Sequence, residues 1–388
     1  MATAFEEFDM SRPEIRMVDL QTQYARIQRE VDEAIASVLK STAFIQGPHV
    51  QKFAAELATY TGAKHVIPCA NGTDALQLAM MALELKPGDE VILPVHTYVA
   101  TAEVIALLRL TPVFVDVDAH SFTLSVDEVR NKITPRTKAV VPVHLYGQCA
   151  HMEPLLAVAK EFGLHVIEDA AQSLGAVYTF SSGQKQSSGT MGVIGCTSFF
   201  PSKNLGCFGD GGAVFVNDSA LADKIQMIAS HGQRVKYQHD IIGINSRLDT
   251  LQAAVLSVKL KYLPEYERNR QLAAAYYDQA LKEISWLTLP ARMPYSTHVF
   301  HQYTVRVGGG KRDELKKYLE RHGVPTMIYY PIPLHLQKAY RQPSAPEGTF
   351  PVTEQLSKEV LSLPIHTEMT EEQLSYICDC IKGFATHG

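Results

Sequence analysis

The sequence is poor in cysteine, and the cysteines it has are scattered. Six stand at positions 69, 149, 196, 207, 378 and 380 of 388 residues, with no C-x-x-C pair among them. Structural zinc sites and disulfide frameworks need thiols at short, regular spacings. We therefore expect neither a metal site nor a fold held together by disulfides.

Positive charge is also scarce. Lysine and arginine number 36 against 41 acidic residues, for a net charge of −5, so nothing favours binding to nucleic acid or to an anionic membrane. Apolar stretches are too short to span a bilayer, because the longest candidate, 97–108, is interrupted by Glu103. Segment 1–9 is acidic where a signal peptide has a basic start. We expect a cytoplasmic protein that binds a small molecule.

Two nucleotide-binding signatures are missing as well. The sequence has no Walker A motif and no G-x-G-x-x-G motif, which argues against a P-loop or a Rossmann dinucleotide site. The composition, 46% apolar and 20% charged, is that of an ordinary globular protein. Evidence for function must therefore come from particular residues and their spacing.

Between residues 62 and 216 the chain alternates regularly between strand and helix patterns. This spacing predicts an α/β fold with a large, mainly parallel sheet and helices on both faces. Ligands bind such sheets at the carboxyl ends of the strands. The predicted strands are 65–68, 90–93, 112–115, 138–143 and 165–167, and the predicted helices are 74–83, 99–108, 126–133 and 152–162.

A pair of helices is predicted next, over 247–262 and 265–284, with Pro264 opening the second. We interpret the pair as the connection between a large α/β domain, 1–262, and a small α+β domain, 263–388. The small domain has a predicted strand near 302–307 and predicted helices over 311–322 and 371–381.

Lys203 and Asp169 are the most informative residues. Lys203 follows an apolar, strand-like run, 196–201, and precedes four closely spaced glycines, whereas Asp169 ends a predicted strand 34 positions earlier. A lysine held partly desolvated in such a turn has a lowered pKa and forms imines readily. With a strand-end carboxylate it indicates a pyridoxal phosphate (PLP) enzyme, in which a lysine holds the aldehyde and an acid keeps the ring nitrogen protonated. The alternatives are a surface lysine and a carboxylate that only caps a helix.

Two other strand ends carry candidate cofactor contacts. Asn71-Gly72-Thr73 lies between a strand and a helix, where amides and the Thr73 hydroxyl can bind a phosphate dianion; a simple helix cap is the alternative. Tyr98 follows the strand 90–94, and its ring can lie on a pyridine ring or belong to the core. The Asp-x-Asp sequence at 116–118 is similar to a glycosyltransferase metal motif, but strand-end acids are common and we expect no metal.

Taken together, these motifs resemble the DegT/DnrJ/EryC1/StrS family of PLP-dependent sugar aminotransferases, which has the aspartate aminotransferase fold (fold type I). The resemblance extends from about residue 17 to residue 364, and several of its motifs are highly specific. It is carried by Gly47-Pro48, the Asn71 turn and the segments 94–101, 167–172, 198–212, 245–254 and 330–335.

The resemblance implies ping-pong transamination. Lys203 would hold the cofactor as a Schiff base and move a proton between the substrate and cofactor carbons; Asp169 would pair with the pyridine nitrogen, and Gln172 would lie against the ring or its phenolic oxygen. An amino acid, L-glutamate in our prediction, would give its nitrogen to PLP, and a keto group on a nucleotide-activated sugar would receive it. Relatives that act as dehydratases have histidine at the lysine position, so Lys203 favours amino transfer.

The resemblance also implies the remaining cofactor contacts. Gly72, Thr73 and Ser198 would hold the phosphate, and Tyr98 would stack on the ring. In this family the residue at Asn245 reaches the phosphate of the neighbouring subunit. The active unit would then be a homodimer with shared active sites.

The segments 71–76 and 245–252 are similar to those of enzymes that aminate C3 of a 3-oxo sugar. The segments 199–203 and 302–306 are similar to UDP-2-acetamido-2-deoxy-3-oxo-glucuronate aminotransferases of bacterial surface polysaccharide (O-antigen) biosynthesis. Such an enzyme must accommodate a sugar carboxylate. Arg234 and Lys236 could provide the positive charge, although a solvated basic loop explains them equally well.

Three more positions are predicted to lie near the sugar. Tyr329 stands where the family often has histidine, His301 is similar to the dTDP-3-oxo-6-deoxyhexose aminotransferases, and His335 ends the segment 330–335. The alternatives are therefore a dTDP-3-oxo-6-deoxyhexose 3-aminotransferase, a dehydratase, and a non-catalytic regulator that binds PLP or a sugar nucleotide.

Overall fold

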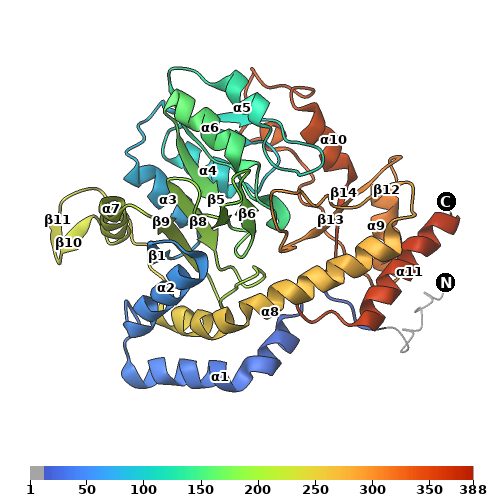
Figure 1. The fold of residues 1–388 in the computed structure, drawn as a ribbon, viewed down its shortest axis with the longest axis horizontal. Coiled ribbons are helices and arrows are strands. Elements are labelled where there is room, and N and C mark those ends of the chain that lie inside the picture. Colours follow the sequence, from blue (N-terminus) through green and yellow to red (C-terminus); the bar gives the residue numbers. More distant parts are fainter. Residues whose placement is uncertain (1–12, 388) are drawn as a thin grey trace, which may run out of the picture.

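The structure, a computed structural model, describes residues 13–387, with side chains up to Phe384. The acidic segment 1–9 lies outside the described residues. Figure 1 shows a large sheet wrapped by helices at one end of the molecule and a small sheet with its own helices at the other. In the described part of the chain, no helix combines the length and apolar character needed to cross a membrane.

The large sheet has seven strands in the order β1-β9-β8-β5-β4-β2-β3. Only β9 runs antiparallel, against both β1 and β8, and the other strands are parallel to one another. The predicted α/β class with a mainly parallel sheet is confirmed. The strands are β1 (His65–Cys69), β2 (Glu90–Pro94), β3 (Thr111–Val115), β4 (Thr137–Val140), β5 (His165–Asp169), β8 (Ile194–Ser198) and β9 (Gly212–Val216).

Helices cover both faces of this sheet because successive side chains of a strand point to opposite faces. Val91 and Leu93 pack into the core under α3 and α4, whereas Ile92 packs into the core under α5 and α6. The helices are α1 (Leu20–Ser41), α2 (Pro48–Thr61), α3 (Gly72–Ala82), α4 (Ala100–Leu107), α5 (Val126–Lys132), α6 (Met152–Phe162) and α7 (Ser219–Ala229). The carboxyl ends of the parallel strands are therefore left as the open edge.

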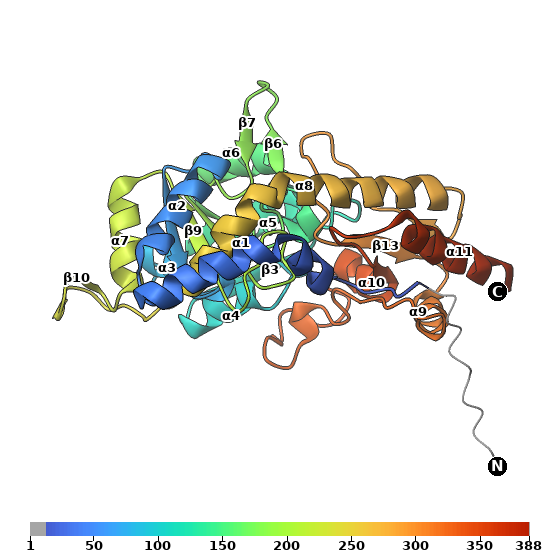
Figure 2. The same ribbon diagram turned by 90° about the horizontal axis from the view of Figure 1, so that it is seen from below.

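One long helix, α8 (Thr250–Leu281), runs from beneath the large sheet to the small one (Figures 1 and 2). The predicted break at Pro264 is wrong, because Pro264 lies inside the helix. An internal proline costs a helix about 3 kcal/mol, and packing of α8 against α1, α2 and α11 (Glu371–His387) offsets that cost. The division of domains at residue 262 falls within α8 and stays a prediction.

The small sheet is antiparallel, with the order β12-β13-β14. Its strands are β12 (Leu287–Thr288), β13 (Tyr303–Val307) and β14 (Val360–Leu363), and α9 (Arg312–Arg321), α10 (Pro351–Glu359) and α11 lie near it. Apolar residues from α8, α9, α11 and all three strands form a separate core. This region is α+β, as predicted.

Two hairpins form small sheets of their own, separate from the seven-stranded and three-stranded sheets. One is formed by β6 (Val177–Thr179) and β7 (Lys185–Ser187), and the other by β10 (Gln233–Val235) and β11 (Gln238–His239). Figure 1 shows the β10–β11 hairpin projecting beyond α7, at the end of the molecule opposite to the small sheet. Tyr237 at its tip is 79% exposed, so the body of the same chain covers little of this hairpin.

Candidate active site

The carboxyl ends of β1, β2, β5 and β8 lie on one edge of the large sheet. Asn71, Thr97, Asp169 and Lys203 follow or end these four strands, and the sheet order brings them together. Two contacts link the ends of strands that are not adjacent in the sheet: Asp169 of β5 accepts a hydrogen bond from α4, which follows β2, and Gly72, after β1, packs against Ser198 of β8. The site predicted from residues scattered over more than 130 positions is therefore one continuous surface.

Lys203 lies in the loop after β8, where its amide donates to the carbonyl of Phe200 at 2.8 Å. Burial of the ammonium group lowers the pKa of Lys203 from 10.5 to about 8, and the negative charge of Asp169 partly opposes this shift. The predicted desolvated lysine is confirmed. An amine with this pKa is partly unprotonated near neutral pH, so it can act as a nucleophile and exchange protons.

Asp169 is the last residue of β5 and is 7% exposed. Its Oδ2 accepts a hydrogen bond from Thr101 Oγ1 at 2.8 Å, and its Oδ1 accepts one from the Ala171 amide at 3.1 Å. Its own amide donates to the Pro142 carbonyl at 2.9 Å. The carboxylate is thus held by donors on two different elements rather than free to rotate.

A buried hydrogen-bonded pair lies directly behind this strand end. Glu168 Oε2 is 2.8 Å from His144 Nε2, and both side chains are completely buried. The Ala150 amide donates to His144 Nδ1 at 3.0 Å, which assigns the imidazole proton to Nε2. Glu168 also accepts from the amides of Gly189, Met191 and Gly192 at 2.5–2.8 Å. The pair is fully hydrogen-bonded and gives Asp169 a rigid support.

The start of α3 forms a narrow cradle with β8 and β9. Asn71 caps the helix, since its Oδ1 accepts from the Asp74 amide at 2.8 Å, so the simple cap considered above is present. The amides of Gly72 and Thr73 belong to the first turn and have no helical acceptor. A Cβ at Gly72 would be 2.8 Å from the Ser198 Cβ, and one at Gly212 would be 2.4 Å from the Asn71 carbonyl. The glycines keep these amides accessible to an anion.

Gln172 is oriented by two partners. Its Oε1 accepts from the Tyr146 amide at 2.8 Å, and its Nε2 donates to the Tyr330 hydroxyl at 3.2 Å. The Tyr330 ring lies 6.2 Å from the ring of Tyr98, which is 58% exposed at the open edge. Tyr330 was not among the predicted site residues. The only sequence signal for it was its place in the segment 330–335.

The three predicted sugar-side residues of the small region lie in different surroundings. His301 is 7% exposed, its Nδ1 has no partner, and burial together with the charge of Lys203 lowers its pKa well below 6.5. Tyr329 lies beside Tyr330 and accepts a hydrogen bond from the Tyr146 hydroxyl through its carbonyl. His335 is 1% exposed and bonded to Glu354 Oε1 at 3.1 Å. His335 is thus engaged in holding the loop before α10.

Asn245, Arg234 and Lys236 are exposed. Asn245 precedes Ser246, whose Oγ accepts from the Ala70 amide at 3.1 Å, beside the α3 cradle. Arg234 and Lys236 belong to the β10–β11 hairpin, and the Lys236 ammonium lies 5.0 Å from the centre of the Tyr237 ring. A single chain leaves these three side chains facing outward.

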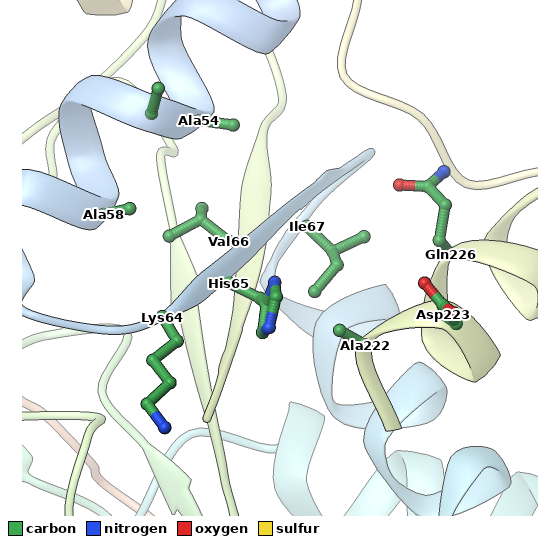
Figure 3. Close-up of a pocket in the computed structure, with 10 residues that line it drawn as sticks. Ala54, Ala58, Lys64, His65, Val66, Ile67, Ala222, Asp223 and Gln226 are labelled. Carbon is green, nitrogen blue, oxygen red and sulfur yellow. The ribbon is translucent and has the colours of Figure 1, made fainter. Parts of the chain in front are cut away.

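A cavity of about 330 Å³ lies on the outer side of β1 and contains none of the predicted site residues (Figure 3). Small alanines of α2 and α7 line it, with Lys64, His65, Asp223 and Gln226 at its rim. His65 Nε2 is 2.9 Å from Ser219 Oγ. The chemistry of the molecule is concentrated at the strand ends instead, because the buried amine and the buried carboxylate are there.

The Asp-x-Asp sequence is structural. Asp116 accepts from the Val352 and Thr353 amides at the start of α10, both at 2.9 Å, and Asp118 accepts from the amides of His120 and Ser121. Over residues 13–387, no group of three or more His, Cys, Asp or Glu side chains could hold a metal ion.

The residues at the strand ends fit PLP. They offer a buried amine with a lowered pKa, a fixed carboxylate, and a helix start that glycines leave open to a phosphate group. Thr97 Oγ1 and Asn204 Oδ1 are buried beside Tyr98 and Lys203 and have no partner in the described chain. Unpartnered buried polar atoms are costly, so their presence here is consistent with a site that binds a polar group.

Comparison with known proteins agrees with this geometry. The DegT/DnrJ/EryC1/StrS aminotransferase family matches residues 25–382. A "pleiotropic regulatory protein" of Geobacillus stearothermophilus is 44% identical over 96% of this chain and 99% of its own length. A UDP-2-acetamido-2-deoxy-3-oxo-D-glucuronate aminotransferase of Pseudomonas aeruginosa is 46% identical over 94% and 98%. A dTDP-3-amino-3,4,6-trideoxy-alpha-D-glucose transaminase of Streptomyces venezuelae is 41% identical over 96% and 97%.

Solved structures similar to this chain come from the same kind of enzyme. The crystal structure of S. venezuelae DesV in complex with a ketimine intermediate superposes with a TM-score of 0.92 at 41% identity, over 96% of this chain and 99% of that one. The architecture is that of fold type I PLP enzymes, as predicted. This chain is a PLP-dependent aminotransferase, and it belongs to the DegT/DnrJ/EryC1/StrS aminotransferase family.

Proposed function

We propose that this enzyme moves an amino group from L-glutamate to the C3 keto group of a nucleotide-activated sugar in the cytoplasm. The favoured sugar is UDP-2-acetamido-2-deoxy-3-oxo-glucuronate, in surface polysaccharide biosynthesis. The observation that carries the proposal is the buried amine of Lys203, with a pKa of about 8, near the fixed carboxylate of Asp169. The 46% identity to the P. aeruginosa aminotransferase supports the choice of sugar.

Asp169 and Lys203 have different roles in this reaction. When bound, PLP supplies an electron sink for the substrate carbon that gains or loses a proton. Asp169 pairs with the ring nitrogen and keeps it protonated, and Lys203 holds the cofactor, then takes up and returns the proton at the reacting carbon. A lysine pKa near neutrality suits both directions of that transfer, because neither protonation state is strongly favoured.

The phosphate is held at the start of α3. The amides of Gly72 and Thr73 and the hydroxyls of Thr73 and Ser198 are the donors, and the helix dipole adds to the attraction. Tyr98 covers the ring, and Gln172 lies against the ring or its phenolic oxygen. Gln172 suits this position because its amide is already oriented by Tyr146 and Tyr330.

The active unit in this proposal is a homodimer in which Asn245 of one chain contacts the phosphate bound by its partner. Asn245 is exposed yet adjoins the α3 cradle through Ser246. Large apolar side chains next to Lys203 are also exposed in a single chain, namely Phe200 at 53% and Phe208 at 44%. Exposed aromatic surface beside an active site is typical of a protein interface.

The sugar side is formed by His301 and Tyr329 and, in the dimer, by the β10–β11 hairpin. Arg234 and Lys236 on this hairpin bear positive charges on flexible, exposed side chains, which suits them to a sugar carboxylate. The Nε2 of His335 is already bonded to Glu354, so only its Nδ1, which has no partner among the described residues, is left for the sugar. We keep it as the weakest member of this set.

A second candidate is amination of a dTDP-3-oxo-6-deoxyhexose. The observation that favours it is the 41% identity to the S. venezuelae dTDP-sugar transaminase over nearly the whole chain. A regulatory role is the third candidate, since a relative of 44% identity is named as a regulator. A purely regulatory protein has no need of a desolvated lysine facing a fixed carboxylate, and this chain has both.

The test has two steps. Glutamate is added to the purified yellow enzyme, and absorbance reports conversion of the bound cofactor to its pyridoxamine form; the 3-oxo sugar nucleotides are then added separately. Return of the original absorbance with the UDP-3-oxo-glucuronate sugar alone supports the leading proposal. Return only with a dTDP-3-oxo-6-deoxyhexose would assign the enzyme to deoxysugar metabolism. If glutamate does not convert the cofactor, the proposed amino donor is wrong.

A further inference from the structure

Thr101, the second residue of α4, donates its hydroxyl to a side chain on another strand end. Threonine in a helix commonly donates its hydroxyl to a carbonyl one turn earlier. Thr59 and Thr61 of α2 do so, to Ala55 and Leu57 at 3.0 and 2.8 Å. Thr101 instead donates to Asp169 Oδ2 at 2.8 Å, and its side chain is completely buried.

This contact joins two separate strand ends. α4 follows β2, whereas Asp169 ends β5, and β4 lies between these strands in the sheet. The second oxygen of Asp169 accepts from the Ala171 amide. Each carboxylate oxygen therefore has one internal donor and keeps a lone pair for another partner. Two donors on different elements fix the plane of the carboxylate, which neither donor could do alone.

We propose that Thr101 is a positioning residue for Asp169: its hydroxyl fixes the orientation of the carboxylate, so that the carboxylate stays directed at the ring nitrogen of the cofactor. The inference rests on the proposed role of Asp169. A hydrogen bond donated to a carboxylate fixes its direction as well as adding energy. Without this donor, the carboxylate can rotate away from the ring nitrogen, and the ring becomes a weaker electron sink.

The choice of threonine follows from its shape. A β-branched side chain has few χ1 rotamers in a helix, so the hydroxyl is held in one direction at little further entropic cost. Valine has nearly the same shape without the hydroxyl, and serine has the hydroxyl without the second branch. Thr101→Val therefore removes the donor and keeps the packing, whereas Thr101→Ser restores the donor.

The test compares PLP with its 1-deaza analogue, in which a C–H group replaces the ring nitrogen. Wild type, Thr101→Val, Thr101→Ser and Asp169→Ala are prepared as holoenzymes, freed of cofactor and titrated with each compound. We expect Thr101→Val to weaken PLP binding about tenfold and the analogue by no more than about twofold. The half-reaction with glutamate should slow about tenfold in Thr101→Val and stay near the wild-type rate in Thr101→Ser.

The outcomes separate the two claims. Equal losses for PLP and its analogue in Thr101→Val would mean that Thr101 only maintains the fold, and an unchanged affinity for PLP would refute the inference outright. Thr101→Ser guards against a packing artefact, because a failure of serine to rescue the rate also contradicts a role for the hydroxyl. If Asp169→Ala itself binds PLP like the wild type, the proposed role of Asp169 is what fails.

Discussion

Lys203 and Lys259 are two buried lysines whose surroundings can be compared directly. Burial lowers the pKa of both from 10.5 to about 8. Lys203 lies in a loop at the open edge of the sheet, within the electrostatic reach of Asp169. Lys259 lies on α8, is 1% exposed, and has its ammonium 5.6 Å from the centre of the Phe208 ring. Among the described residues, no carboxylate pairs with Lys259.

The difference shows that desolvation alone does not identify a catalytic lysine. A lowered pKa prepares an amine for chemistry only where a substrate can reach it and where other groups act on the same molecule. Lys203 has a phosphate cradle, a fixed carboxylate and an exposed aromatic ring around it. Lys259 has an aromatic ring and a helix interior, which stabilise a cation or simply enclose it.

The largest expected effect comes from replacing each lysine. Lys203→Ala should slow the half-reaction with glutamate by about 10³-fold or more, because both the covalent anchor and the proton carrier are lost. Lys259→Met, which removes the other desolvated amine at similar volume, should stay within about threefold of the wild type. Stopped-flow absorbance with glutamate measures both variants. Comparable losses in the two would show that the comparison between the lysines is mistaken.

The second effect is a pH dependence of cofactor capture. The amine of Lys203 must be unprotonated to react with an aldehyde, and its pKa is about 8. The rate of PLP capture by the cofactor-free enzyme should therefore rise about tenfold per pH unit below pH 8 and level off above it. The rate in Lys259→Met should follow the same curve. A rate of PLP capture that does not change between pH 6 and 9 would show that titration of Lys203 does not control this step.

The third effect is expected at Asn245, which in the proposed dimer adds a phosphate contact to the site of the other chain. Asn245→Ala should weaken PLP binding about tenfold, because one donor to the phosphate is lost. Mixing Asn245→Ala chains with Lys203→Ala chains should restore part of the activity, since one site of the mixed dimer then has both residues intact. If mixing restores nothing although mixed dimers form, the two residues do not belong to a shared site.

The smallest effect concerns Glu267, another buried titratable group on α8. Burial raises the pKa of Glu267 from 4.5 to about 7, and Tyr60 donates to its Oε1 at 2.5 Å. A raised carboxyl pKa means that the folded state binds the proton more tightly, so stability from this group is present at low pH and is lost as pH rises from 4.5 to 7.

Glu267→Gln should remove this loss. Its free energy of unfolding should exceed that of the wild type at pH 8, and this excess should shrink as the pH falls toward 4.5. Denaturant titrations at the two pH values measure the difference, and Glu265→Gln, at an exposed neighbour, is the control. A difference that does not change with pH would place the effect in packing against Gly175 rather than in charge.

Much of the large domain followed from local patterns. The predicted strands at 65–68, 90–93, 112–115 and 165–167 lie within one or two residues of the observed ends, as do most of the predicted helices. Hydrophobic periodicity and turn residues are local properties, so the sequence carries them directly. The strand predicted over 138–143 ends at Val140, before Pro142, which cannot donate to a neighbouring strand.

The region of the small sheet and the hairpins were harder to predict. β12 and β14 are two and four residues long, too short for a periodic signal. The break at Pro264 was predicted from proline chemistry alone, whereas packing on three other helices keeps α8 continuous. His335 is predicted to lie near the sugar, which stays a prediction, and its contact with Glu354, 19 residues later, was not predicted. Each of these outcomes depends on contacts between distant segments.

The sequence by itself determined the class of fold and the cofactor and predicted the two central residues, because strand ends, a lysine before glycines and a terminal carboxylate can be recognised without knowing their neighbours. Only the tertiary structure decided that Lys203 rather than Lys259 faces a carboxylate, that Thr101 bonds to Asp169, and that Asn245 is left facing outward. Desolvation and hydrogen bonding depend on which distant segments are in contact, and the order of strands in the sheet determines those contacts.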